Sequence, residues 1–220
     1  SDVCSSDLYV NDDRGVIRIT VRGSWIHDIG DAPFTGAQHG IGIYVRAYLA
    51  GRVNATIVDT TVERYQKGGI VTNGQGADVR ISGNTVRGLG PVGFIAQNGI
   101  QVGYGATASV IGNTVTNNSF TGTSTVSGGI IVVGGAGYGL CPGAVPCRYT
   151  SGTQIVQNEV HDNDVGVYLT NLDADFAPPV VATNIKVVNN VISSRSLQNF
   201  YGGTGYQAGI SDVGNNDKLV

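Results

Sequence analysis

Charged side chains are scarce in this chain: they make up 13% of its 220 residues and nearly cancel, leaving a net charge of −3. That share is about half the usual one, and the balance lacks the basic footprint of a nucleic-acid-binding protein. No apolar run reaches the length of a membrane-spanning helix, so we expect no membrane span. Methionine is absent and no secretory signal is recognisable. We therefore expect a fragment whose signal peptide lies outside this sequence.

The first eight residues, Ser1 to Leu8, resemble a translated sequencing-adapter scar of the kind found in metagenome-derived sequences. We expect residues 1–8 to be a non-native leader and residues 9–220 to form a single domain, truncated at both ends. The alternative is an ordinary polar strand at the N-terminus. Either way, the length of the chain is that of about one domain.

Proline is also rare, with 6 residues, whereas glycine is abundant, with 34. Val and Ile dominate the apolar residues, and Asn and Thr the polar ones, a balance that favours strands and tight turns over helices. Of the 3 cysteines, Cys141 and Cys147 flank a short loop that contains proline and glycine. They predict a small disulfide and an oxidising compartment, with two free thiols as the alternative.

One motif recurs six times along the chain. Each copy alternates apolar and polar residues and ends in a small polar residue, any residue, and Val or Ile. The endings are Ser24-Trp25-Ile26, Thr60-Thr61-Val62, Asn84-Thr85-Val86, Asn113-Thr114-Val115, Asn158-Glu159-Val160 and Asn190-Val191-Ile192. A second short strand follows each copy and opens with a glycine, at positions 40, 69, 99, 129, 166 and 209. The shortest repeat, from Thr60 to Asn84, is 24 residues long, enough for one coil of three strands and three corners.

These repeats predict an all-β solenoid. One coil cannot bury its apolar side chains alone, but coils stacked about 4.8 Å apart place like residues over like. The four asparagines of the motif are then expected to form a ladder of side-chain amides, and the opening glycines to supply a positive φ at a corner. The hexapeptide repeat of left-handed β-helices is absent. We therefore predict a right-handed, single-stranded parallel β-helix of about six coils with neither end capped.

The repeats resemble the right-handed β-helix repeat family of the pectate lyase-like superfamily, over roughly Val16 to Val213. The resemblance implies a secreted or cell-surface bacterial protein that binds or processes an acidic polysaccharide, since such β-helices include lyases, hydrolases and epimerases. It does not extend to the enzyme motifs. Trp25-Ile26-His27-Asp28 reverses the Asp–His order of pectate lyases, and Gln38-His39-Gly40 only approaches the His motif of polygalacturonases.

Polar residues outside the structural pattern follow each copy of the motif. If the coils stack in register, these residues form a polar strip about 25–30 Å long, enough for several sugar units. Aromatic faces stack on sugar rings, while Asp, Asn and Arg bind hydroxyls or carboxylates. The same residue types are also good turn formers, so solvated corners are the alternative. The candidate substrate-binding residues, on the strip and on the second strands, are Glu63, Tyr65, Asp162, Asp164, Arg195, Tyr44 and Tyr168.

His27, Asp28, Asp31 and His39 form the densest group of titratable residues. A histidine oriented by a carboxylate is the usual base near neutral pH. If the protein is a lyase, His27 or His161 is the candidate base and Asp28 its orienter. Arg64 or Arg87 would then neutralise the carboxylate of the substrate. The group equally offers a metal two nitrogens and two oxygens, or is ordinary loop polarity.

A further polar run, Asn171-Leu172-Asp173-Ala174-Asp175, has alternate oxygen ligands, as calcium loops do, with an ordinary solvated loop as the alternative. No cofactor beyond Ca2+ is indicated. Two functions therefore remain open. The protein is either a polysaccharide-binding enzyme, a lyase or a glycoside hydrolase, or a non-catalytic β-helix such as an adhesin or a phage-like stalk.

Overall fold

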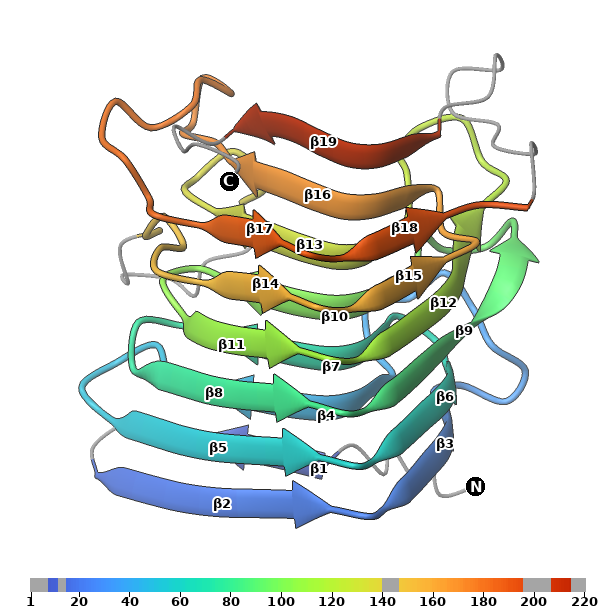
Figure 1. Ribbon diagram of the computed structural model, residues 1–220, viewed down its shortest axis with the longest axis horizontal. Helices are drawn as coiled ribbons and strands as arrows, with labels where there is room; N and C mark the ends of the chain where they lie inside the picture. The colour runs from blue at the N-terminus through green and yellow to red at the C-terminus, as the bar shows by residue number, and fades with distance from the viewer. Residues whose placement is uncertain (1–7, 12–14, 140–146, 196–206, 215–220) are drawn as a thin grey trace.

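The chain winds through three parallel sheets, named A, B and C here, and returns to each of them once per coil (Figure 1). The computed structural model describes residues 8–11, 15–139, 147–195 and 207–214. Each coil runs from sheet B through sheet C to sheet A, and it turns in the right-handed sense that parallel crossovers almost always have. The predicted all-β, right-handed parallel β-helix of about six coils is confirmed.

Sheet A has seven strands and sheets B and C have six each. In spatial order, the strands of sheet A are β1 (Leu8–Asn11), β4 (Ile41–Arg46), β7 (Gly68–Asn73), β10 (Asn98–Gly103), β13 (Gly128–Gly134), β16 (Val165–Asn171) and β19 (Ala208–Gly214). Those of sheet B are β2 (Val16–Arg22), β5 (Arg52–Val58), β8 (Ala77–Ser82), β11 (Thr107–Ile111), β14 (Gln154–Val156) and β17 (Lys186–Val188). Those of sheet C are β3 (Trp25–Ile29), β6 (Thr61–Tyr65), β9 (Thr85–Val92), β12 (Thr114–Phe120), β15 (Glu159–His161) and β18 (Val191–Ser193). Strand β1 begins at Leu8, the last residue of the expected leader, which pairs with Ile43.

The corner between sheets B and C is short, and it divides each copy of the repeated motif into two strands. One residue with φ between 50 and 67° turns the chain in each coil, at positions 23, 59, 83, 112, 157 and 189. The next residue points inward and bonds to its counterpart in the neighbouring coil. The predicted asparagine ladder is confirmed, because Nδ2 of Asn84, Asn113 and Asn158 each lies 2.9 Å from Oδ1 of the next asparagine.

Glycines recur at the start of the sheet A strands for a reason that differs from the predicted one. Gly69, Gly99, Gly129 and Gly166 do not have positive φ, so that expectation is wrong for them. They are needed because sheets A and C approach closely. A Cβ on Gly99, for example, would lie 2.4 Å from Val115 Cγ1 and 2.5 Å from the carbonyl oxygen of Gly129.

Columns of identical or similar aliphatic side chains fill the space between the sheets. The strand register places these residues one above another, and all of them are fully buried. The columns are Ile70, Ile100, Ile130 and Val167 in sheet A, Ile57, Ile81, Val110 and Ile155 in sheet B, and Val62, Val86, Val115 and Val160 in sheet C. None of the described residues forms a helix with the length and hydropathy of a membrane span.

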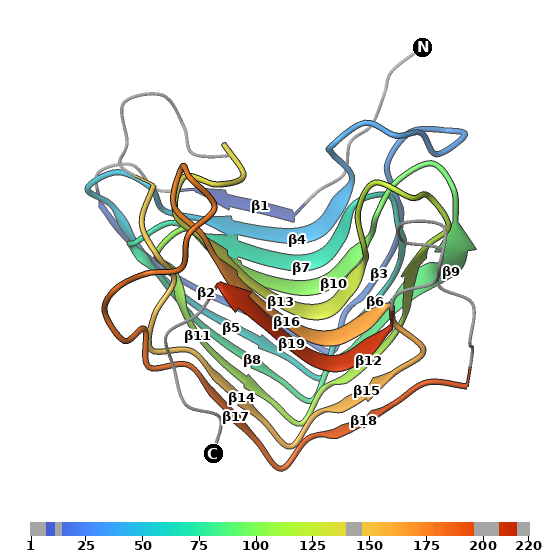
Figure 2. The same cartoon turned by 90° about the horizontal axis from the view of Figure 1, so that it is seen from above.

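Loops of variable length join sheet C to sheet A and sheet A to sheet B. Figure 2 shows these two sets of loops standing on opposite sides of the outer face of sheet A. In the second set, the long loop between β13 and β14 contains Cys147, which is disulfide-bonded. Its predicted partner, Cys141, lies outside the described residues. The loops therefore form two borders along the outer face of sheet A.

Candidate functional site

The predicted polar strip exists as a column of side chains along sheet C. Strand register places His27 beside Glu63, Glu63 beside Arg87, Arg87 beside Thr116, and Thr116 beside His161. The column continues to Ser193. The expectation that these residues stack in register is thus confirmed.

The charged groups at the first coils of the strip are paired with one another. Asp28 accepts a hydrogen bond from Arg64 Nε at 2.5 Å, and its other oxygen lies 2.6 Å from His27 Nδ1. These two contacts, that of His27 foremost, lower the pKa of the Asp28 carboxyl. One coil further on, Glu63 lies 3.5 Å from Arg87. His27, Asp28 and Arg64 therefore converge, but their polar groups face each other.

The far end of the strip is paired in the same way. Asp162 accepts a hydrogen bond from the backbone N–H of Arg195 at 2.7 Å, and its second oxygen lies 3.6 Å from Arg195 Nε. His161 Nδ1 lies 2.8 Å from Ser193 Oγ, and its Nε2 lies 3.8 Å from Glu159. Exposed pairs of this kind contribute little to stability, but they neutralise charge that a ligand would otherwise meet.

Tyr65 was expected on the strip, and this expectation is wrong. Arg64 has a φ of 52°, which interrupts the alternation of β6, so Tyr65 points inward beside Ile29 and is 0% exposed. Its hydroxyl donates to Asn118 Oδ1 at 2.6 Å. Asn118 Nδ2 in turn donates to Asn163 Oδ1 at 2.9 Å, a second asparagine contact that the sequence did not reveal.

Asp164 was also expected to contact substrate, and it is buried instead. Its carboxylate accepts hydrogen bonds from Ser119 Oγ at 2.6 Å and from the backbone N–H groups of Phe120 and Ser127, at 3.0 and 2.9 Å. It therefore holds both ends of the loop between β12 and β13. The role is structural, because a carboxylate is kept buried where several donors surround it.

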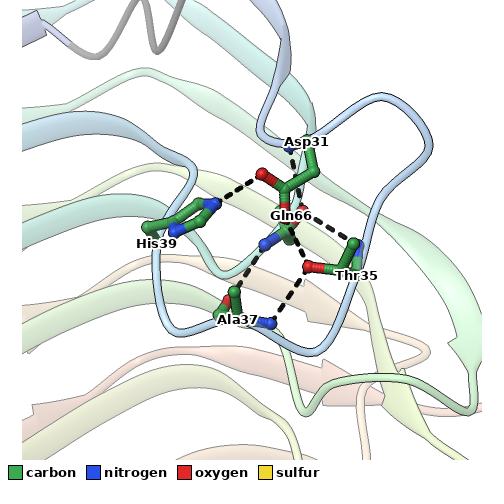
Figure 3. A network of polar contacts seen from close by, with 5 residues as sticks. All are labelled: Asp31, Thr35, Ala37, His39 and Gln66. Atoms are coloured by element: carbon green, nitrogen blue, oxygen red, sulfur yellow. Dashed lines mark hydrogen bonds and ion pairs between the residues drawn. The ribbon is translucent and has the colours of Figure 1, made fainter. Parts of the chain in front are cut away.

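The remaining two members of the histidine group lie apart from His27 and Asp28. Figure 3 shows the loop between β3 and β4 folded around the buried Gln66. Gln66 Oε1 accepts from the N–H groups of Asp31 and Thr35, both at 3.0 Å, and Nε2 donates to the Ala37 carbonyl at 2.9 Å. His39 Nε2 lies 2.7 Å from Asp31 Oδ1. Hydrogen bonds from Thr35 and then His39 lower the pKa of the Asp31 carboxyl.

The expected four-residue group is thus two separate pairs, His27 with Asp28 and Asp31 with His39. Within the described ranges, no three His, Cys, Asp or Glu side chains gather as metal ligands do. In the polar run at the end of β16, Asn171 exchanges hydrogen bonds with the backbone of Thr150 at 2.9 and 3.0 Å. Asp173 Oδ1 accepts from the N–H groups of Asp175 and Ala177, both at 2.9 Å. Calcium binding there stays a prediction.

A separate hollow lies on the outer face of sheet A between the two borders of loops. It consists of two adjoining parts of about 430 and 200 Å³ that share five lining residues. Those five are Gln38, Lys67, Asn98, Gln101 and Tyr104. We call the two parts together the sheet A groove. It runs across five coils, from Tyr44 on β4 to Tyr168 on β16, about 19 Å at the spacing of parallel strands.

The floor of the sheet A groove combines aromatic, aliphatic and amide side chains. One column along it is Tyr44, Val71, Gln101, Ile131 and Tyr168. Besides Tyr44 and Tyr168, five aromatic rings contribute to its lining, those of Tyr48, Phe94, Tyr104, Phe120 and Tyr138. Phe176 packs edge-on against Tyr138. Tyr44 and Tyr168 are therefore the sequence-predicted residues that line this groove.

Hydrogen bonds link the amides of the floor within β10 and from β10 through β7 to β4. Asn98 Nδ2 donates to Gln101 Oε1 at 3.4 Å, Gln101 Nε2 donates to Asn73 Oδ1 at 3.1 Å, and Asn73 Nδ2 donates to the Tyr44 hydroxyl at 3.3 Å. These long contacts fix the orientation of the amides and leave them at the surface of the groove. Planar amides beside aromatic faces are suited to the hydroxyls and the apolar faces of sugars.

Lys67 is the one charged side chain among the described residues that line the groove. Its ammonium donates to the carbonyl of Ala96 at 2.8 Å. Burial lowers the pKa of Lys67 to about 8. The groove therefore carries at most one positive charge near neutral pH, and its described lining has no carboxylate.

Sequence reasoning missed most of this groove. Gln38 belongs to the loop between β3 and β4, and Tyr138 follows β13. Asn98, Gln101 and Tyr104 lie in or just after the third strand of their coil. A detectable signal was the outward row of that strand, where Tyr44 and Tyr168 already marked the solvent side.

Comparison with known proteins identifies the architecture. A family model described as "Right handed beta helix region" matches residues 8–217, nearly the whole chain. No curated protein matches the chain, and no solved structure does.

Proposed function

The chain belongs to the right-handed β-helix family, and from this premise we propose that its sheet A groove binds a polysaccharide without cleaving it. The observation that carries the proposal is the composition of the groove. Aromatic rings and oriented amides line it, and it runs parallel to the solenoid axis. An extended polymer fits a hollow of this shape, because successive coils place one outward side chain after another along it at a regular spacing.

The chemistry of the groove favours binding over catalysis. Glycoside hydrolysis usually employs a pair of carboxylates on either side of the bond, whereas the described lining of the groove has none. A lyase needs a base and a cation that neutralises the carboxylate of a uronate. The candidate bases, His27 and His161, and the candidate cations, Arg64 and Arg87, lie on sheet C. Each of them contacts another side chain of the strip or of its neighbouring strands.

The groove also favours a ligand that is largely uncharged. An acidic polymer carries a carboxylate on most of its sugars, and each buried carboxylate requires a cation or several donors. Lys67 supplies only one such partner. Neutral sugars instead need donors, acceptors and apolar faces, which the floor of the groove provides. A secreted or cell-surface location agrees with the disulfide at Cys147.

The test is binding to a panel of soluble polysaccharides, namely a glucan, a mannan, a xylan, polygalacturonate and alginate. Affinity electrophoresis and calorimetry would measure binding, and absorbance near 232 nm with a reducing-end assay would measure cleavage. We expect retention by a neutral polymer and no product with any of the five. The double variant Tyr44→Ala/Tyr168→Ala should weaken binding about tenfold or more, since each loses a stacking surface.

The matched control is Arg64→Ala, which changes the strip on sheet C and leaves the groove intact. It should bind as the unaltered protein does. The proposal is wrong if none of the five polymers binds, or if Arg64→Ala abolishes binding while the tyrosine variant retains it. Product formation would instead restore the enzymatic alternative.

A further inference from the structure

Tyr104 lies where the two parts of the sheet A groove adjoin. It follows β10 directly and lines both parts. Its ring packs against Tyr48, with centroids 6.5 Å apart, and against Val133, so that only 3% of the residue is exposed. A residue in this place contacts any ligand that extends along the whole groove.

The hydroxyl of Tyr104 is buried and has no hydrogen-bond partner among the described residues. Such a group destabilises the folded protein, because it loses water without gaining a protein partner. The buried hydroxyl of Tyr65, by contrast, has a partner, since it donates to Asn118 Oδ1 at 2.6 Å. A phenylalanine at position 104 would fill the same space without the unpaired group.

The backbone of Tyr104 is also in an unfavourable conformation. Its φ is 54°, in the left-handed region that side chains with a Cβ adopt at some energetic cost. In the preceding coil the equivalent corner is formed by Gly74, with a φ of 97°, because Asn73 pairs with Gly103. A glycine satisfies this corner more easily.

We propose that the Tyr104 hydroxyl is a ligand-recognition donor, and that a hydroxyl or ring oxygen of a neutral sugar in the groove accepts the hydrogen bond that Tyr104 lacks in the free protein. This inference rests on the proposed function and names a residue that determines specificity within it. Burial, followed by the neighbouring Tyr44 and Tyr138, raises the pKa of Tyr104, so the group remains a donor over the physiological range. Tyr48 and Val133 pack against the ring in the free protein, and because the hydroxyl is closed to solvent there, a small displacement of the surrounding side chains lets a ligand oxygen reach it.

Two single-atom deletions test this inference. Tyr104→Phe removes the unpaired hydroxyl, and Tyr65→Phe removes a hydroxyl that is bonded within the core. We expect Tyr104→Phe to weaken the best-binding neutral polymer about tenfold and to leave Tm unchanged or raised. Tyr65→Phe should do the opposite, lowering Tm by a few degrees with binding unchanged.

The outcomes separate this inference from the proposed function. If the unaltered protein binds a neutral polymer and Tyr104→Phe binds it equally well, the role of Tyr104 is refuted while polysaccharide binding stands. If Tyr104→Phe lowers Tm as Tyr65→Phe does, its hydroxyl is structural and the inference also fails. If no polymer of the panel binds, both proposals fall together. Weakened binding with an undiminished Tm is the result that supports Tyr104 as a recognition residue.

Discussion

The asparagine ladder predicts a specific loss of stability when its middle member is truncated. Asn113 is 1% exposed, and its Nδ2 donates to the Ile81 carbonyl at 3.0 Å and to Asn158 Oδ1 at 2.9 Å. Its Oδ1 accepts from both Asn84 N and Asn84 Nδ2 at 2.9 Å. Truncation in Asn113→Ala therefore removes four hydrogen bonds from the core.

One of the groups left behind, the backbone N–H of Asn84, has no other hydrogen-bond partner in the ladder and becomes unpaired. By contrast, Asn84 Nδ2 keeps Ile57, Asn158 Oδ1 keeps the N–H of Asn113, and the Ile81 carbonyl lies within the strands of sheet B. An unpaired buried group costs about 1–3 kcal/mol, and each of the other lost bonds about 0.5–1.5 kcal/mol. We expect Asn113→Ala to lower the free energy of unfolding by about 4 kcal/mol, measured by urea denaturation followed by far-ultraviolet circular dichroism.

The end of the ladder is the matched control. Asn190 makes the same kinds of bond, to Asn158 and to the Ile155 carbonyl, but it is only half-buried, so water can replace them. Asn190→Ala should cost about 1–2 kcal/mol. Equal losses at the two positions would refute the argument from burial. A loss below about 1 kcal/mol at Asn113 would refute the ladder as a source of stability.

Two further predictions concern single side chains. Thr72 lies in the core between Val45 and Val102, and its buried hydroxyl has no partner among the described residues. Thr72→Val should therefore raise the free energy of unfolding by about 1 kcal/mol in the same urea assay, and a decrease would contradict this. Burial lowers the pKa of Lys67 from 10.5 in the unfolded chain to about 8 in the folded protein. Between these two pH values the unfolded chain binds more protons than the folded protein does, so the free energy of unfolding rises with pH. In a Tm–pH profile, Lys67→Met should lack that rise between about pH 8 and 10.5, and an identical profile would contradict the burial of the charge.

The fold was predictable because its determinants repeat. The same polar residue at the same place in each coil, as at Asn84, Asn113 and Asn158, makes sense only if the coils stack. The division of each motif into two strands was not predicted, since residues as different as Gly83 and Gln157 form the same corner. The glycine columns were predicted with the wrong cause, because the close approach of sheets A and C is a property of packing between coils.

The residues of the site were less predictable, because they depend on where the alternation of inward and outward side chains along a strand is interrupted. A residue with positive φ, such as Arg64, shifts the following side chain from the outside to the inside. For this reason Tyr65 lies in the core, although its neighbours Glu63 and Arg64 lie on the surface. The strip was correctly placed, but a sequence does not show that its charges pair with one another. Tyr104 carried no repeated pattern at all.

The borders of the groove are held in place by buried polar side chains, and this bears on how it would bind. Gln66 fixes the loop between β3 and β4, and Asp164 fixes that between β12 and β13. Between them, Gln97 accepts from the N–H of Leu89 at 2.9 Å and donates to the Tyr65 carbonyl at 2.5 Å. All three side chains are almost fully buried. Since these contacts exist without a ligand, binding needs little ordering of the borders, and the free energy of each new contact contributes nearly fully to affinity. A single hydrogen bond, such as that expected at Tyr104, should then be measurable in the affinity.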